Sequence, residues 1–140
     1  MNRVNCFLIL LFSLIAVTRV SALETRTIIH LSTLPVTEGL GIYSSAVMIK
    51  DGNTNCKAAG ITNISLLALN AGLGSFIAFG KPSNYEAFAR IHHIIGFTAI
   101  GASVWLTISG ALEKSVPSHA KYTSGGYAIM TTVPLLIFNF

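Results

Sequence analysis

Two long apolar segments without a charged residue constrain this chain more than any other feature. They cover residues 58–79 and 91–112, and each is 22 residues long. A helix of about 20 apolar residues crosses the hydrocarbon core of a bilayer. Backbone groups in lipid must be satisfied within helices or closed barrels, and the sequence has no alternating strand pattern. The two segments therefore predict membrane-spanning helices.

Two further segments, residues 27–50 and 118–140, lie on either side of this pair and contain more polar residues. Short polar connectors join all four segments. Antiparallel helices with short connections form bundles. The predicted fold class is an all-α integral membrane four-helix bundle, with the lipid bilayer as its main partner. Only 10% of the residues are charged, against about 25% in soluble domains. The net charge of +4 is scattered along the chain, so no basic run indicates nucleic-acid binding.

The first 22 residues have the features of a secretory signal peptide. Arg3 gives a basic start, residues 6–17 are apolar, and Val20 and Ala22 are small residues placed for cleavage. Cleavage after Ala22 would divide the chain into a signal peptide, residues 1–22, and a four-helix transmembrane domain, residues 23–140. Secretory insertion would then leave the mature N-terminus outside. The alternative is an uncleaved N-terminal anchor.

Three histidines lie near the outer ends of two helices that run in the same direction. His30 lies four residues after Arg26, and His92 and His93 lie two and three residues after Arg90 in the next segment that runs in the same direction. The sequence therefore predicts that His30 and His92 lie at similar depth. Neutral imidazole is a haem ligand, and a pair of histidines can fill both axial positions of the iron. The alternative is that each histidine is an ordinary polar residue at the membrane interface.

Helical spacing separates His92 from His93. Steps of three and four from His92 meet small or weakly polar residues, whereas the same steps from His93 meet bulky ones such as Phe97 and Val104. Small residues mark closely packed faces of membrane helices. His92 is therefore predicted to face the bundle interior and His93 its edge. The steps from His30 also follow a small or polar face, through Thr37 and Gly41.

Residues 90–101, RIHHIIGFTAIG, resemble a helix motif of the cytochrome b561-like membrane haem proteins, in which a histidine precedes a glycine by four residues. Here those residues are His92 and Gly96. His119 in residues 118–128, SHAKYTSGGYA, is similar to the start of a later core helix. The resemblance implies a four-helix core in which alternate helices supply histidine pairs to two b haems. His30 and His92 would form the first pair.

The chain departs from this family at the second pair. A partner for His119 would lie near the inner end of the second helix, but residues 58–66 contain no histidine. The resemblance therefore implies one haem b held by His30 and His92. His119 is a weaker candidate, and its alternative role is that of a residue at a helix start or on the surface.

Glu38 is a further candidate because an ionisable side chain inside a membrane segment is usually functional. It would relay a proton linked to haem reduction or contact a quinone-like substrate. The alternative is a protonated carboxyl group that is hydrogen-bonded to Asn70 of the next helix.

The sequence thus predicts a membrane b-type cytochrome that carries single electrons, either with a redox partner or as a homo-oligomer. Whether it belongs to an oxidoreductase enzyme is open. The alternative is a cofactor-free helical membrane subunit that acts in assembly or protein interaction, with its small residues serving helix packing. A third option is a piece of a larger transporter-like fold.

Overall fold

The computed structural model describes residues 25–139, and all regular structure in this range is helical. The predicted signal peptide, residues 1–22, lies outside the described residues. The helices are α2 (Thr25–Asp51), α3 (Thr54–Gly80), α4 (Tyr85–Leu112) and α5 (Ser118–Asn139). The prediction of an all-α fold is therefore confirmed for this part of the chain.

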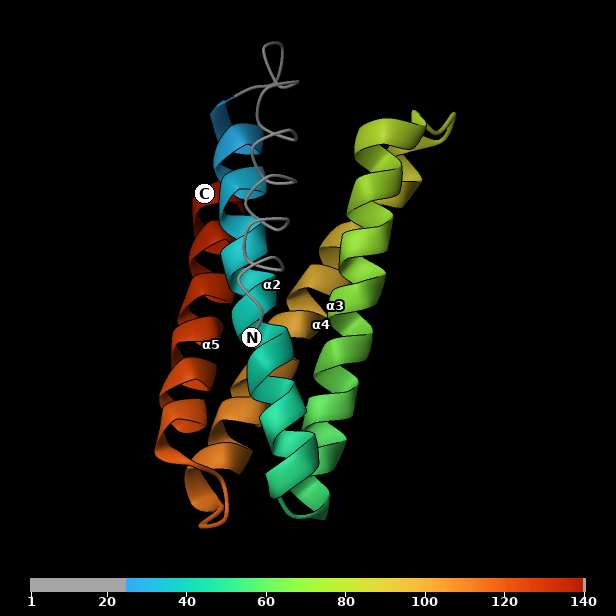
Figure 1. The fold of residues 1–140 in the computed structure, drawn as a ribbon. Coiled ribbons are helices and arrows are strands. Elements are labelled where there is room, and N and C mark those ends of the chain that lie inside the picture. Colours follow the sequence, from blue (N-terminus) through green and yellow to red (C-terminus); the bar gives the residue numbers. More distant parts are fainter. Residues whose placement is uncertain (1–24, 140) are drawn as a thin grey trace, which may run out of the picture.

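Each helix runs antiparallel to the next, and each packs against both of its neighbours around the bundle (Figure 1). Helices α2 and α4 are diagonal partners that run in the same direction and touch little. Figure 1 also shows that α2 and α5 diverge from α3 and α4 towards the end at which α2 begins. The starts of α2 and α4 both lie at this wider end of the bundle.

The connectors are shorter than the sequence indicated. Residues 85–90 were predicted to belong to the polar connector, but α4 begins at Tyr85. Glu86 lies in the first turn of α4, where its charge is favourable to the helix dipole. At the other end of the bundle, the Asn53 side chain accepts a 3.0 Å hydrogen bond from the Cys56 N–H and caps α3. The Asn53 cap, which hydropathy does not capture, helps to set the start of α3.

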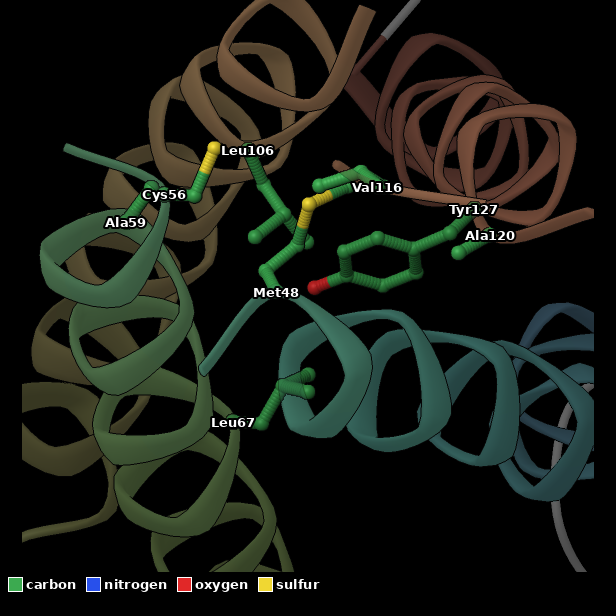
Figure 2. Close-up of a cluster of buried hydrophobic side chains, with 8 residues drawn as sticks. All are labelled: Met48, Cys56, Ala59, Leu67, Leu106, Val116, Ala120 and Tyr127. Carbon is green, nitrogen blue, oxygen red and sulfur yellow. The ribbon is translucent and has the colours of Figure 1, made fainter. Parts of the chain in front are cut away.

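The apolar core lies in the half of the bundle opposite the histidines. Met48 of α2 is fully buried at its centre, with side chains of α3, α4 and α5 around it (Figure 2). Tyr127 of α5 and Leu106 of α4 are also fully buried. The flexible Met48 side chain fills the space where the four helices meet. This core joins α2 to α5 below the wider end.

Helices α3 and α4 are long and apolar enough to cross a membrane, and in the described part of the chain only these two helices are. Most of their apolar surface faces outwards, since 11% and 33% of the respective apolar windows are buried inside the protein. Ile61, Leu69 and Phe97 are among the exposed large side chains. A continuous apolar exterior of this kind fits lipid better than water. The predicted membrane character is therefore supported for two of the four helices.

Candidate functional site

The starts of α2 and α4 bring His30 and His92 together. The centroids of the two imidazole rings are 6.3 Å apart, and the ring planes are inclined by 84°. Both side chains are half-buried. The sequence prediction that these two histidines lie at similar depth on helices that run in the same direction is confirmed by this contact. The sequence separation of the pair shows that it is made by the bundle and not by local structure.

His92 faces the interior as predicted. Its Nδ1 atom is buried and has no hydrogen-bond partner among the described residues. The ring lies against Gly74 of α3, where a Cβ atom would come 3.1 Å from the His92 Cε1 atom. The absence of a side chain at Gly74 therefore makes the space that the imidazole ring occupies.

His93 is exposed, whereas His92 is half-buried. Its ring centroid lies 6.3 Å from that of His92, but the one-residue offset directs the two side chains to different faces of α4. The helical neighbours of His92, including Ala99 and Ser103, are buried, whereas Phe97 and Val104 on the His93 face are exposed. The predicted division of the two histidines between interior and edge is confirmed.

A cavity of about 80 Å³ extends from His30 into the bundle. All four helices line it: His30, Thr33, Leu34, Thr37 and Glu38 of α2; Leu67 and Asn70 of α3; Gly96 and Ala99 of α4; Met130 and Thr131 of α5. The residue four positions after His92, Gly96, is thus part of the cavity wall. The cavity lining combines apolar side chains with polar ones, among them Thr37, Glu38 and Asn70.

Glu38 and Asn70 both line this cavity. No hydrogen bond joins them, although the sequence offered such a bond as the alternative role of Glu38. The Oδ1 atom of Asn70 is buried and has no hydrogen-bond partner in the described part of the chain. The structure thus brings Glu38 to the same cavity as His30 without giving it the predicted partner.

His119 does not belong to this site. It is exposed in the first turn of α5, at the opposite end of the bundle from His30 and His92 (Figure 1). Its ring contacts that of Tyr43 on α2, with centroids 6.1 Å apart. Helix α3, which would have to supply its partner histidine, has none. The contacts of His119 are those of a surface residue.

The sequence reasoning missed a buried hydrogen-bond chain across three helices. The Tyr127 hydroxyl donates to Asn63 Oδ1 at 3.0 Å, and Asn63 Nδ2 donates to the Ser45 hydroxyl at 2.9 Å. All three side chains are fully buried. Asn63 is the residue that stands where the family resemblance called for a histidine, and here it joins α2, α3 and α5. The signal was the presence of an amide side chain in an otherwise apolar span.

The donor set at the candidate site is small. No group of three or more histidine, cysteine, aspartate or glutamate side chains gathers around a metal position in residues 25–139. Two imidazoles alone do not complete the tetrahedral shell of a structural zinc site. They do complete the shell of an iron ion whose other four ligands come from a macrocycle.

No protein-family model, curated protein or solved structure matches this chain. The case for its function therefore rests on its own residues and their geometry.

Proposed function

We propose that the protein is a four-helix membrane cytochrome of b type, which binds one haem between His30 and His92 and carries single electrons. The observation that supports this proposal most directly is the 6.3 Å separation of the two imidazole centroids. His30 and His92 come from diagonal helices and have no third ligand beside them in the described part of the chain.

The separation of the rings suits axial ligation. A metal–imidazole nitrogen bond is about 2 Å long, so one metal ion between two imidazoles places the ring centroids about 6 Å apart. The observed 6.3 Å agrees with this spacing. The His92 Nδ1 atom is buried without a hydrogen-bond partner among the described residues, and a bond from this nitrogen to the iron would satisfy it.

The wall residues suit a flat group, but the free volume is small. The residues near the histidines include Gly74, Gly96 and Ala99, which are all small. The cavity of about 80 Å³ is smaller than the 300 Å³ or more of an ordinary ligand site. Haem binding would therefore require this cavity to enlarge beside the histidine pair.

When bound, the haem iron would supply reversible exchange of one electron. The chain would supply the two axial imidazoles from His30 and His92, and Gly74 would hold the His92 ring in place. Apolar side chains of α3 and α4 would keep water from the site and lower its dielectric constant, which influences the potential. A single haem near the outer surface does not bridge a core of about 30 Å, so a redox partner or a second copy would complete transmembrane transfer.

The proposal includes the membrane topology. All four helices would cross the bilayer, with the signal peptide removed and the start of α2 outside. Helices α3 and α4 support it by length and composition. Helices α2 and α5 carry more polar residues, and those that line the cavity face the interior, which is where polar groups of membrane helices belong.

A cofactor-free packing subunit is the second candidate, and close glycine contacts favour it. A Cβ atom at Gly60 would lie 2.8 Å from the Ser45 carbonyl oxygen, and one at Gly41 would lie 2.7 Å from the Tyr127 ring. These small residues let the helices approach closely without any cofactor. In this case His30 and His92 would be polar residues at a membrane interface.

A visible absorption spectrum of the purified protein, expressed with ample haem, distinguishes the two candidates. The cytochrome predicts a sharp Soret band and distinct α and β bands after reduction with dithionite. His30→Ala and His92→Ala should abolish this low-spin spectrum, while His93→Ala, an exposed neighbour, should preserve it. A colourless protein, or equal spectra for all three variants, would contradict the proposal and favour the packing subunit.

A further inference from the structure

An open apolar groove lies between α3 and α4, in the halves of these helices that are nearest to the connector of residues 81–84. Its volume is about 500 Å³, and sites for small molecules usually occupy about 300–1,000 Å³. None of its lining residues also lines the cavity beside His30, so the groove is separate from the proposed haem site. Its lining is entirely hydrocarbon and includes Leu69, Gly72 and Phe76 of α3 and Phe88, Ile91 and Ile95 of α4.

One glycine and two aromatic rings give the groove its shape. A Cβ atom at Gly72 would meet no other atom within 4 Å, so this glycine leaves open space in the groove. The Phe76 and Phe88 rings bridge the two helices at the connector end, with centroids 5.2 Å apart. The Phe76 ring also lies against Gly80, where a Cβ atom would come 2.7 Å from it. The groove therefore ends about one helical turn, roughly 6 Å, below the connector.

The dimensions of the groove suit a slender hydrocarbon better than a second helix. Its lining residues 68–76 extend over roughly 12 Å of α3, whereas a membrane-spanning partner helix would pack along a core of about 30 Å. Both helices that form the groove are long and apolar enough to cross a membrane. In a bilayer, an open apolar groove at this position would lie beside lipid acyl chains.

The connector end of the groove is positively charged. Lys81 directly follows Gly80 and is exposed, and none of the acidic side chains in residues 25–139 forms an ion pair with it. Helix α4 begins nearby, and its N-cap residue, Asn84, makes no side-chain capping hydrogen bond. The first backbone N–H groups of α4 therefore add a partial positive charge at the same end. A negatively charged group complements this end of the groove.

The other two charged residues near this end lie on a different side of α4. At 100° per residue, Glu86 and Arg90 are on the side of the helix away from Phe88 and Ile95. They are four residues apart and of opposite charge, so each offsets the other. Lys81 is thus left as the full charge at the end of the groove.

We propose that this groove binds one acyl chain of an anionic phospholipid, whose phosphate group lies at Lys81 and the start of α4. The chain would enter the groove about one turn below the connector, because the hydrocarbon of a lipid begins just below its headgroup. Basic residues at the ends of membrane helices bind anionic headgroups in this way. The inference rests on the proposed membrane topology but not on haem.

Extraction of the membranes with alkaline carbonate tests the topology first. Release of the protein would overturn the membrane proposal and the lipid site with it. Native mass spectrometry of the full chain in detergent then tests the site, with phosphatidylglycerol and phosphatidylcholine of identical acyl chains as probes. We expect a one-to-one adduct with phosphatidylglycerol, bound about fivefold more tightly than phosphatidylcholine. A protein that stays in the membrane but forms no adduct would overturn the lipid site alone.

Two glycine variants locate the acyl chain. Gly72→Phe should fill the groove and abolish the adduct, whereas Gly101→Phe, the same change at an open position on another face of α4, should retain it. Persistence of the adduct in Gly72→Phe would refute the groove as its site. A dimer of the chain that is lost in Gly72→Phe would instead assign the groove to a second copy.

Two exposed cations locate the headgroup without any change to the groove. Lys81→Gln should remove the preference for phosphatidylglycerol, whereas Arg90→Gln should retain it. Equal binding of the two lipids by the wild-type protein, or an unchanged preference in Lys81→Gln, would contradict the assignment to an anionic lipid. Since none of these measurements needs haem, their results are separate from that of the absorption spectrum.

Discussion

The imidazole ring of His92 lies directly over Gly74, so that a Cβ atom at this glycine would be 3.1 Å from the ring Cε1 atom and 3.7 Å from both ring nitrogens. The ring therefore contacts α3 at Gly74, and its centroid lies 6.3 Å from that of His30 on α2. Two helices fix the imidazole before any ligand binds, and such preorganisation reduces the cost of binding. The relationship also shows which glycine of α3 cannot be replaced without moving a candidate ligand.

We predict that Gly74→Val displaces His92, because the branched side chain would occupy the position of the ring. Haem affinity should fall by about tenfold or more, as for other residues that orient a metal ligand. The measurement is haem titration followed by absorption. Gly72→Val is the matched control, since a Cβ atom at Gly72 meets nothing within 4 Å and both changes carry the same helix-propensity cost. Equal affinities in the two variants would show that contact with Gly74 does not position His92.

Tyr127→Phe should lower the free energy of unfolding by about 1–3 kcal/mol, because it leaves the buried Asn63 Oδ1 atom without its donor. Denaturation in detergent measures the difference. Tyr122→Phe removes the same hydroxyl group from an exposed side chain of the same helix, and its effect should stay within about 0.5 kcal/mol. If both variants lost the same stability, the bond from Tyr127 to Asn63 would not be the cause.

Helical periodicity was sufficient to predict part of the site. Counting from Arg26 and Arg90 placed His30 and His92 at one depth, and the sizes of residues three and four positions away separated His92 from His93. These predictions depend only on the 3.6-residue repeat and on helix direction. They hold because each helix is regular over the turns concerned.

Contacts that depend on the relative depth of distant helices could not be predicted in this way. Thr131 lines the cavity with Glu38, and Tyr127 bonds Asn63, 64 residues away. Depth along α5 is set by the connector after α4 and by packing on Met48, which hydropathy does not encode. Similarly, α4 begins at Tyr85 within a polar stretch that hydropathy alone assigns to the connector. The local sequence pattern thus predicted which residues share a helix face, but not how far each helix is shifted along its axis relative to the others.

Gly60→Ala should destabilise the bundle by about 1–3 kcal/mol, because its Cβ atom would meet the Ser45 carbonyl oxygen at 2.8 Å and a backbone oxygen cannot rotate away. Gly101→Ala is the control. Its Cβ atom has open space, so the better helix propensity of alanine should stabilise the protein by up to about 1 kcal/mol. Thermal unfolding of the two variants should therefore shift in opposite directions. A stabilised Gly60→Ala variant would show that α2 and α3 are not closely packed at this point.

The connector between α4 and α5 should make stability depend on pH. The Ser115 backbone N–H donates to Glu113 Oε1 at 3.1 Å, and its hydroxyl lies 3.0 Å from the same oxygen. The Ser115 N–H first, and then its hydroxyl, favour the carboxylate and hold the pKa of Glu113 below its ordinary value. The pKa of Glu113 is thus lower in the folded protein than in the unfolded protein. The stabilisation by the ionised carboxylate is therefore complete above the unfolded pKa and is lost as the pH falls through the folded pKa.

Acidification from about pH 5 to about pH 2 should therefore lower the Tm less in Glu113→Gln than in the wild-type protein. Ser115→Ala should have an intermediate effect, since it keeps the backbone N–H but removes the hydroxyl group. That hydroxyl also lies 2.6 Å from the Asp51 carbonyl oxygen at the end of α2, and its single hydrogen can serve only one of the two acceptors at a time. Protonation of Glu113 frees the hydroxyl for Asp51, so the connector should stay attached to α2 at low pH. Identical acid profiles for Glu113→Gln and the wild-type protein would show that this carboxylate does not stabilise the connector.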